Sequence, residues 1–392
     1  MTLRTLQDLG DPSGSTVFVR VDFNVPLNPD GTVADDARIR AALPTITELL
    51  SLGARVVLAS HLGRPMGKVR TELSMRAPAE ALEGLLGRPV TWIPDPLPSA
   101  LPAEPVVMLD NLRFDPGEEA DDASFAGRLA ELADAYVDDA FGAAHRAHAS
   151  VSALPELMLA SGRPAVAGRL VQREIEVLST LLHDPEHPYV AILGGAKVSD
   201  KLGVIGSLID RVDALLIGGA MAFTLIAANG GDVGSSLVER DRFEEVRATR
   251  ARAAAKGVLI ELPQDVVAAE ALSSDVKWRT VPATDIPRGL MGLDIGPKTV
   301  ASYAEIIADA KTILWNGPMG VFELEPFSAG TRGIATAVAR SDAFSVVGGG
   351  DSLLAVKKAG LEDGFSHLST GGGASLEFLE GRALPGITIL ED

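Results

Sequence analysis

The chain has 392 residues, of which 46% are hydrophobic and 22% are charged. This length and composition predict a globular protein of two or three domains and exclude a disordered or collagen-like chain. The 53 acidic and 35 basic residues give a net charge of −18, which argues against nucleic acid and anionic membranes as partners. The chain contains no cysteine, which excludes disulfides, thiolate metal sites and cysteine nucleophiles.

No targeting or membrane segment is expected. The N-terminal residues 1–14 have no apolar run before their first acidic residue, so we expect no secretory signal. Uncharged apolar stretches of about 18 residues do not occur, so we expect no membrane span. The expectation is therefore a cytoplasmic protein.

Nine short segments rich in β-branched residues or leucine predict buried strands. They are Thr16–Val21, Arg55–Ala59, Val106–Leu109, Ala135–Val137, Val190–Leu193, Ala214–Ile217, Val258–Glu261, Thr312–Trp315 and Phe344–Val347. Helical periodicity follows several of them, at Arg38–Leu50, Ser199–Ile209, Phe243–Ala255, Thr331–Ala339 and Ser352–Ala359. Strands that alternate with helices predict parallel sheets with helices on both faces. Because a single sheet of this size would be unusual, we predict two α/β domains in tandem, each a Rossmann-like three-layer αβα sandwich.

The boundary between the domains is predicted near residues 160–185. Residues 164–182 follow Ser161-Gly162, have apolar residues at helical spacing, and predict a helix that starts at Pro164. The proline-containing segment 183–188 then ends the helix. This helix either connects the domains or lies on the surface of the first, and we favour a connector with a hinge at 166–185, between domains at 1–165 and 186–375.

The two halves of the chain differ in the means by which they bind anions. Residues 1–170 contain 13 glycines and one lysine, whereas residues 171–392 contain 27 glycines and eight lysines. The first half therefore offers mainly arginine and histidine, and the second offers glycine turns with lysines.

Five glycine-containing turns follow predicted strands of the second half. They are Gly194–Lys197, Gly218-Gly219, Asn316–Gly320, Gly348–Asp351 and Ser369–Gly373. The carboxyl ends of parallel strands share one edge of a sheet, and glycine lets the backbone approach a ligand closely. A single such turn is usually only a tight turn, but five together favour a phosphate site next to helix N-termini.

Two lysines and one aspartate add to this hypothesis. Lys197 and Lys201 are spaced i, i+4 near a predicted helix start, which places both on one helical face. Asp351 follows a triple glycine, where it either caps a helix or holds Mg²⁺ beside phosphates; the residue alone favours capping. Neither the P-loop motif G-x-x-x-x-G-K-[ST] nor the dinucleotide motif G-x-G-x-x-G occurs, which argues against a P-loop enzyme and an NAD-dependent dehydrogenase.

The first half contains five segments with arginine or histidine, most of which follow predicted strands. The segments are Arg20–Asn24, Asp35–Arg38, His61–Arg64, Asn111–Arg113 and His145–His148. Arginine binds phosphate and carboxylate groups through two hydrogen bonds and keeps its charge. Any one of these arginines could simply pair with a neighbouring acid such as Asp22, but five at strand ends favour a small substrate with several negative charges.

Together these segments resemble the phosphoglycerate kinase family. The matching motifs are RVDFNVP (20–26), DDARI (35–39), HLGRP (61–65), LRF (112–114), DDAFGAAHRAHAS (138–150), GGAKVSDK (194–201), GLDIGP (292–297), NGPMGVFE (316–323), GGGDS (348–352) and STGGGASLEFLEG (369–381). They run in the family's order over nearly the whole chain. The departures are Ala143, where threonine is frequent, and Gln264, where valine is frequent.

The resemblance implies two sites and a catalytic set. The phosphoglycerate site would comprise Asp22, Phe23, Asn24, Arg38, His61, Leu62, Gly63, Arg64, Arg113 and Arg146. The nucleotide site would comprise Lys197, Lys201, Gly218, Gly219, Gly292, Asn316, Pro318, Glu323, Gly349, Gly350, Asp351 and Ser352. Glu323 would accept hydrogen bonds from the ribose, and Asp351 would hold the metal of Mg-ADP or Mg-ATP rather than act as a cap. The catalytic residues would be Arg38 on the substrate side, Lys197 on the nucleotide side, and the backbone of Gly371 and Gly372.

The activity implied is Mg²⁺-dependent, reversible transfer of a phosphoryl group from 1,3-bisphosphoglycerate to ADP, which yields 3-phosphoglycerate and ATP. A monomer that closes about a hinge is implied, with residues 376–392 returning to the first domain. The alternative is a non-catalytic two-domain nucleotide or anion sensor, which need not retain Arg38, Lys197 and Asp351 together.

Overall fold

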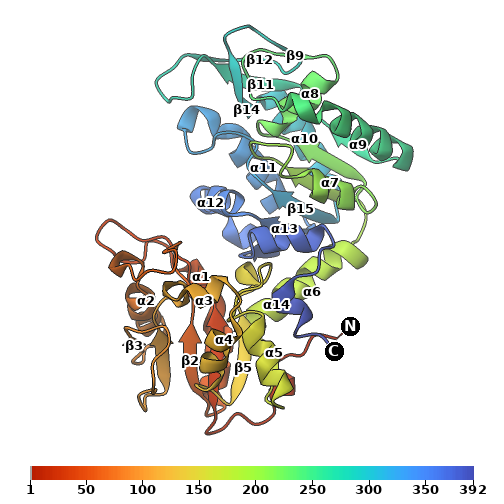
Figure 1. Ribbon diagram of the computed structural model, residues 1–392. Coiled ribbons are helices and arrows are strands. Elements are labelled where there is room, and N and C mark those ends of the chain that lie inside the picture. The colour runs from red at the N-terminus through yellow and green to blue at the C-terminus, as the bar shows by residue number, and fades with distance from the viewer. Residues whose placement is uncertain (1) are drawn as a thin grey trace. The chain divides into compact units, whose positions relative to one another are not determined.

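The computed structural model describes residues 2–392 and divides them into two compact units (Figure 1). Unit 1 contains the chain up to Glu176 together with Ala383–Asp392. Unit 2 contains Val177–Arg382. Helix α6 (Arg169–His183) contains the point at which the chain passes from unit 1 to unit 2.

Unit 1 is built on a six-stranded parallel sheet with the strand order β3-β4-β2-β1-β5-β6. Its strands are β1 (Thr16–Val21), β2 (Arg55–Ala59), β3 (Thr91–Ile93), β4 (Val106–Leu109), β5 (Ala135–Asp139) and β6 (Ala165–Ala167). Its helices are α1 (Ala37–Ser51), α2 (Arg76–Leu86), α3 (Pro116–Glu119), α4 (Ala123–Ala130), α5 (Ala153–Ala160) and α14 (Pro385–Thr388).

Side chains alternate across this sheet because successive residues of a strand point to opposite faces. Val17, Val19 and Val21 of β1 belong to the core that includes residues of α1 and α2. The intervening Phe18 stacks on Tyr136, with their ring centroids 6.1 Å apart. Both faces of the sheet are therefore buried, as expected for a parallel sheet.

Unit 2 contains a second six-stranded parallel sheet with the order β10-β8-β7-β15-β16-β17. The strands are β7 (Tyr189–Leu193), β8 (Ala214–Ile217), β10 (Leu259–Glu261), β15 (Thr312–Asn316), β16 (Phe344–Gly348) and β17 (His367–Ser369). The helices are α7 (Leu202–Leu208), α8 (Met221–Ala228), α9 (Phe243–Lys256), α10 (Pro297–Asp309), α11 (Ala329–Ala339), α12 (Gly350–Ala359) and α13 (Gly373–Leu379). Trp315 of β15 is fully buried in its core, among side chains of α10, α11 and α12.

Two small sheets complete unit 2. Strands β11 (Asp265–Ala269), β12 (Trp278–Pro282) and β14 (Met291–Ile295) pair antiparallel in the order β12-β11-β14. Strands β9 (Asp232–Val233) and β13 (Asp285–Ile286) form a parallel pair. Short 3₁₀ helices connect elements of both units, at Leu6–Leu9, Thr71–Leu73, Leu112–Phe114, Phe141–Ala143, Arg240–Arg242, Glu325–Phe327 and Glu362–Gly364.

The predicted α/β class with parallel sheets is confirmed, but two local predictions are wrong. Pro164 does not start a helix: β6 follows it at Ala165–Ala167, the Pro164 carbonyl accepts a hydrogen bond from the Tyr136 N–H, and α6 begins at Arg169. The helix predicted from Ser199 begins instead at Leu202.

Residues from both ends of the chain pack together in unit 1 (Figure 1). Leu3 and Glu391 form an antiparallel bridge, and the Arg4 N–H donates to the Leu390 carbonyl at 2.9 Å. Arg4 also donates to the Ile389 carbonyl and pairs with Asp392. The last residues of the chain are thus an integral part of unit 1.

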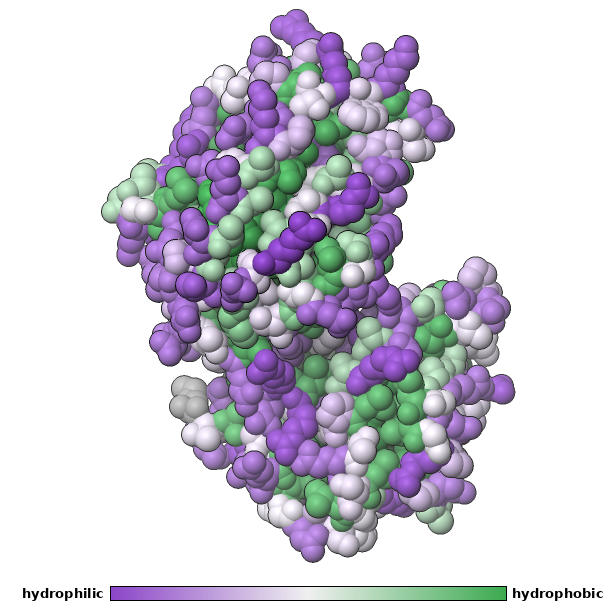
Figure 2. Space-filling view, turned by 180° about the vertical axis from the view of Figure 1, so that it is seen from behind, coloured by the Kyte–Doolittle hydropathy of each residue, from purple (hydrophilic) through white to green (hydrophobic). Residues whose placement is uncertain are grey.

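Hydrophilic residues cover much of the face drawn in Figure 2, with groups of hydrophobic residues between them. Leu237 and Leu272 are among the exposed large hydrophobic residues, and both line a cavity of unit 2. Within residues 2–392, no helix combines the length and apolar character needed to span a bilayer.

Candidate functional site

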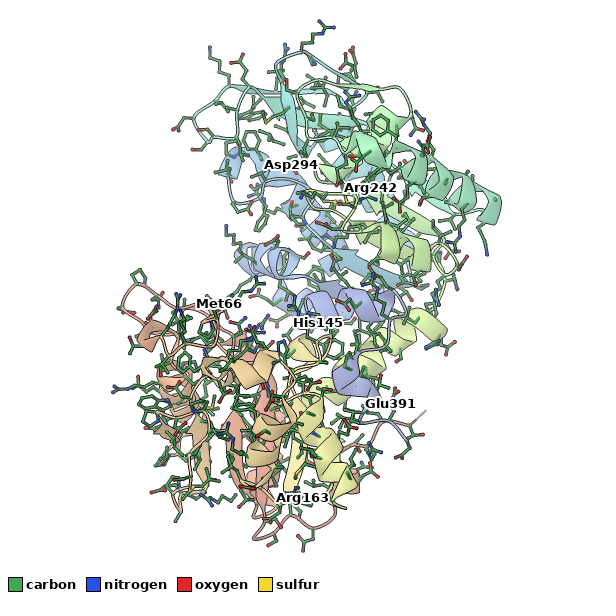
Figure 3. All side chains as sticks on the ribbon, in the orientation of Figure 1. Met66, His145, Arg163, Arg242, Asp294 and Glu391 are labelled. Carbon is green, nitrogen blue, oxygen red and sulfur yellow. The ribbon has the colours of Figure 1, made fainter. Side chains whose placement is uncertain are left out.

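The predicted residues of unit 1 follow the carboxyl ends of its strands. Asp22 and Asn24 follow β1, His61 follows β2, and Arg113 follows β4. Figure 3 shows the labelled residues Met66 and His145 at this edge of the sheet, and Arg163 at the opposite end of the unit. The parallel topology therefore collects these polar groups at one edge.

Arg38 is held by Asp22. Arg38 lies in the first turn of α1, and its Nη1 donates to Oδ2 of Asp22 at 2.5 Å. The Asp22 side chain is 8% exposed, whereas the Arg38 side chain is 34% exposed. The pairing with a neighbouring acid is therefore real for Arg38, but about a third of its side chain remains exposed to solvent.

The loop after β2 is fixed from two directions at Gly63. Its N–H donates to Oδ1 of Asn24 at 2.9 Å, and its carbonyl accepts from Nη1 of Arg113 at 2.9 Å. Gly63 has a φ of +62°, which is in the left-handed region that favours glycine. The amide of Asn111 supports the same loop by donating to the carbonyls of Leu62 and Leu73.

Arg20 is one of the five strand-end arginines, but the family resemblance does not assign it to the site, and it contacts His61. Its side chain is fully buried, and its Nη2 lies 3.2 Å from Nδ1 of His61. Its Nε donates to Ser150, whose hydroxyl donates in turn to Glu118. Burial, followed by the charges of Arg20, Arg113 and Arg38, lowers the pKa of His61 well below its usual value.

His61 is therefore neutral at neutral pH, and its tautomer follows from its partner. Arginine can only donate, so Nδ1 of His61 must accept and its ring proton must lie on Nε2. The site thus contains a neutral imidazole donor surrounded by permanent positive charges.

The remaining predicted residues of unit 1 differ in exposure. The side chains of Phe23 and Leu62 are buried, so a ligand would meet only their backbone atoms. The Phe23 N–H is already used, because it donates to the Ser60 hydroxyl at 2.8 Å. Arg64 and Arg146 are exposed, and Nε of Arg146 lies 3.3 Å from Nε2 of His145.

In unit 2, the glycine turns surround a polar cavity of about 430 Å³. Its lining includes Gly194, Gly195, Lys197, Asp200, Lys201, Asn316, Pro318, Gly349, Gly350, Asp351, Ser352, Gly372 and Gly373. Four separate strand-end turns thus meet around one space. Gly371 does not line it, and its N–H donates to the Ser369 hydroxyl at 3.3 Å.

Both predicted lysines line the polar cavity, but not from one helical face. Lys197 lies in the turn that precedes α7, and Lys201 is the N-cap residue of that helix. Nζ of Lys201 is hydrogen-bonded to Oδ1 of Asn316, and the residue is 9% exposed. Burial lowers the pKa of Lys201 to about 8, although Asp200, Asp351 and Glu380 oppose the shift.

An apolar cavity of about 310 Å³ adjoins the polar one. Its lining includes Phe223, Leu237, Pro263, Leu272, Met291, Gly292, Leu293, Asp294, Val321 and Glu323. Gly195, Ala196, Pro318 and Asp351 line both cavities. The combined space suits a ligand with a flat apolar part and an anionic part.

Close backbone packing explains some of the predicted glycines. A Cβ on Gly218 would overlap Met319, and a Cβ on Gly292 would overlap the ring of Phe223. Gly219 lines the apolar cavity and has a φ of +65°. Gly218 therefore acts by packing beneath the site, whereas Gly219 and Gly292 form part of its wall.

Asp351 and Ser352 lie in the first turn of α12. The N-cap residue is Gly349, so Asp351 does not occupy the capping position that its sequence context allowed. The Ser352 hydroxyl is buried and accepts from the Gly317 N–H at 2.7 Å. Among residues 2–392, no cluster of three or more histidine, aspartate or glutamate residues is placed to bind a metal. Asp351 lines both cavities, and Asp200 is a second carboxylate on the polar one. Such a position would suit a cation that is coordinated partly by phosphate oxygens.

Asp294 is a second residue that the sequence did not reveal (Figure 3). Its carboxylate accepts from the Gly330 N–H at 2.6 Å and from the Ile295 N–H at 2.9 Å. A Cβ on Gly320 would overlap it, so it also packs directly against the turn 316–320. Burial raises the pKa of Asp294 to about 7.

Comparisons with known proteins agree over the whole chain. Residues 6–382 match the family model described as "Phosphoglycerate kinase". The chain is 54% identical to the phosphoglycerate kinase of Salinispora tropica and 50% identical to that of Herpetosiphon aurantiacus, and each alignment covers 100% of both chains. Among solved structures, it resembles phosphoglycerate kinase from Coxiella burnetii, with a TM-score of 0.89, 42% identity and 99% of each chain covered. The enzyme from Pyrococcus horikoshii gives a TM-score of 0.85 and 33% identity, with 99% of this chain and 98% of that one covered.

Proposed function

Because the chain belongs to the phosphoglycerate kinase family, we propose that each of its units binds one of the two substrates of the family's reaction. That reaction transfers a phosphoryl group reversibly from 1,3-bisphosphoglycerate to ADP and yields 3-phosphoglycerate and ATP. The chain is a kinase of glycolysis whose acceptor in the ATP-consuming direction is a carboxyl group. The relatives give no support to the alternative of a non-catalytic sensor.

Unit 1 holds the phosphoglycerate in this proposal. The observation that carries the assignment is the group of donors at one sheet edge, in which Arg38 is oriented by Asp22 and His61 is a neutral donor beside Arg113. Exposed Arg64 and Arg146 add positive charge. Such donors suit the phosphate and carboxylate groups of a small anion.

Unit 2 holds the nucleotide in the two adjoining cavities. The base would lie among the apolar side chains, and the phosphates would meet the glycine turns with Lys197 and Lys201. Glu323 lines the apolar cavity and would accept hydrogen bonds from the ribose. This arrangement supports a nucleotide because a base is apolar and flat whereas phosphates require N–H donors and cations.

The chemistry requires alignment and neutralisation of charge rather than a base. The attacking carboxylate of 3-phosphoglycerate is already ionised at neutral pH. The neutral state of His61 agrees with this, because the mechanism assigns it donation and not proton removal. Arg38 stabilises the transferred phosphoryl group from the substrate side, Lys197 does so from the nucleotide side, and the Gly372 turn contributes backbone N–H groups.

Mg²⁺ would be held by Asp351 together with phosphate oxygens of the nucleotide. When bound, the ion neutralises phosphate charge. The position of Asp351 in the walls of both cavities supports this role. We expect Asp351→Ala to shift the Mg²⁺ titration of activity to higher concentration; unchanged metal dependence would contradict the assignment.

Three further properties are proposed: the oligomeric state, the cellular location and a hinge motion. A cytoplasmic monomer is proposed on the basis of the family, and light scattering after gel filtration tests the mass. Transfer also requires the two substrates to come within bonding distance, so we propose that the units bend about a hinge when both are bound. Small-angle scattering with both substrates, compared with each alone, tests this motion.

A coupled assay tests the function as a whole. The protein is mixed with 3-phosphoglycerate and Mg-ATP, and formation of 1,3-bisphosphoglycerate is linked to oxidation of NADH. We expect turnover that depends on both substrates. A folded protein that binds the nucleotide without turnover would contradict the assignment.

A further inference from the structure

The turn that carries Lys197 is anchored by a carboxylate from a distant segment, and we propose that this residue, Glu239, is a positioning residue for Lys197. We define the lysine turn as residues 194–201. The inference rests on the proposed function, because it takes Lys197 to contact the transferred phosphoryl group. Glu239 itself does not line the polar cavity, so it would act through the turn.

The Glu239 carboxylate accepts hydrogen bonds from the middle of the lysine turn. Its Oε1 accepts from the Ser199 hydroxyl at 2.6 Å, and its Oε2 accepts from the Ser199 N–H at 3.1 Å. The Val198 N–H also donates to this carboxylate. One side chain thus holds the two residues that directly follow Lys197.

The other contacts of the lysine turn explain why the hydrogen bonds to Glu239 matter. Its first residues are held by the neighbouring strand-end turn, because the Gly194 N–H donates to the Asn316 carbonyl and the Gly195 N–H donates to the Pro318 carbonyl. Its end is held by α7, which begins only at Leu202. Lys197 lies between these two anchors, so the bonds to Glu239 restrict the backbone where the lysine emerges.

The charge of Glu239 also suits this place. Burial acts to raise the pKa of Glu239, but the hydrogen bonds from Ser199 and Val198 and the charge of Lys197 outweigh it, so the pKa lies below its usual value. Glu239 is therefore a carboxylate at neutral pH. It accepts charge-assisted hydrogen bonds, which are stronger than neutral ones.

Glu239 belongs to a segment that also contacts the nucleotide space. Leu237 lines the apolar cavity, and the Ser236 hydroxyl accepts from the Gly292 N–H at 2.9 Å. The Glu239 N–H donates to the Thr224 hydroxyl of α8 at 3.1 Å. A segment fixed to β14 and α8 therefore connects the wall of the apolar cavity to the lysine turn.

A mutant cycle on the full-length enzyme tests the proposal. We expect Glu239→Ala to lower kcat about tenfold, because a misplaced catalytic group loses rate even when chemistry at the group is intact. The KM for 3-phosphoglycerate should not change. Glu239→Gln keeps one acceptor oxygen for Ser199, so its kcat should lie closer to that of the parent enzyme than to that of Glu239→Ala. Glu244→Ala removes an exposed glutamate in the first turn of α9 and serves as the matched control, with unchanged kcat.

The background of Lys197→Ala separates positioning from a general structural effect. If Glu239 acts through Lys197, Glu239→Ala should cause no further loss of kcat once the lysine is absent. An equal loss in both backgrounds would overturn the proposal. A Lys197→Ala variant with nearly normal kcat would instead overturn the proposed role of Lys197, and the positioning role with it. Circular dichroism establishes that each variant is folded, and Glu239→Gln provides the comparison if the alanine variant is not.

Discussion

The Arg38 side chain is held by an ion pair and is still partly exposed to solvent. Asp22 holds one amino group at 2.5 Å, and the side chain remains 34% exposed. We expect Arg38→Ala to lower kcat by a factor on the order of 10³, the scale of arginine contributions to phosphoryl transfer. Steady-state kinetics with 3-phosphoglycerate and Mg-ATP measures the loss.

Arg40→Ala is the control for this prediction. Arg40 lies on the same helix, its side chain is 59% exposed, and its guanidinium forms an ion pair with Asp36. Its removal should leave kcat unchanged. A loss of less than tenfold for Arg38→Ala, with substrate binding intact, would contradict the catalytic role.

Lys201 should give nucleotide binding a pH dependence. Burial lowers its pKa to about 8, and a lysine is charged only below its pKa. Above pH 8 the free enzyme therefore loses a positive charge from the polar cavity in which the phosphates are proposed to bind. The KM for nucleotide should then rise. Lys201→Arg keeps its charge throughout and should show a flatter profile between pH 7 and 9; an identical rise in both proteins would assign the effect to another group.

At the scale of single residues, the sequence predicts a site residue when its place relative to a strand identifies it. Several predicted site residues lie directly after strands, and the parallel topology brings those strand ends to one edge; their roles stay predictions. Arg20 is among the arginines that the sequence singles out, but its buried position and its contact with His61 are not predicted, because that contact crosses between strands and joins residues 41 apart. Glu239 is 40 residues from Ser199, and no local pattern links them.

Among the elements, the glycine turns of unit 2 depend on close backbone approach. A Cβ on Gly194 would lie 2.7 Å from the methyl carbon of Met319 and 2.8 Å from the Gly317 carbonyl oxygen. We expect Gly194→Ala to destabilise unit 2 by about 1–3 kcal/mol, the usual cost of overpacking. Urea unfolding followed by tryptophan fluorescence, to which buried Trp315 contributes, measures the change.

Gly206→Ala is the matched control within α7. The nearest atom to its added Cβ would be Nη1 of Arg252 at 3.9 Å, which is ordinary contact. Alanine also favours a helix interior over glycine by about 0.5–1 kcal/mol. This variant should therefore be as stable as the parent or more so, and equal destabilisation of both would contradict the steric explanation.

Strands were easier to predict than helix starts or short edge strands. Runs such as Arg55–Ala59 were right to the residue, because five consecutive aliphatic or long side chains fit a strand buried on both faces. The three-residue edge strands β3, β6 and β17 offer few residues for a pattern and were not predicted, although the equally short edge strand β10 was predicted as Val258–Glu261. The predicted start of α7 is three residues too early. The Ser199 hydroxyl donates a hydrogen bond to Glu239, and this tertiary contact overrides the local helical spacing.

At the scale of the whole molecule, unit 1 depends on the last ten residues of the chain. Leu384, Ile387 and Leu390 are buried, with at most 3% exposure. Each buried apolar side chain stabilises by about 1.5–3 kcal/mol, so deletion of 383–392 should destabilise unit 1 by several kcal/mol. Hydrogen exchange measured by mass spectrometry should show faster exchange in β1, β5 and β6 than in the strands of unit 2. Uniform acceleration over both units would contradict the separate role of these residues.

The division into two α/β units follows from alternation of strands and helices, which the sequence displays directly. The return of the C-terminal residues to unit 1 was implied only by family resemblance, because nothing in the segment Ala383–Asp392 states its partner. Its partners, among them Arg4 and Leu3, are nearly four hundred residues away.

This return has a consequence for the order in which the protein acquires its structure during synthesis. Every residue of unit 2 precedes Ala383, so unit 2 can fold as soon as its own chain has left the ribosome. Unit 1 is synthesised first for the most part, yet its bridge between Leu3 and Glu391 must wait until unit 2 has been made. The portion translated earliest is thus the last to be completed, and a nascent chain released early would carry a finished unit 2 beside an open unit 1.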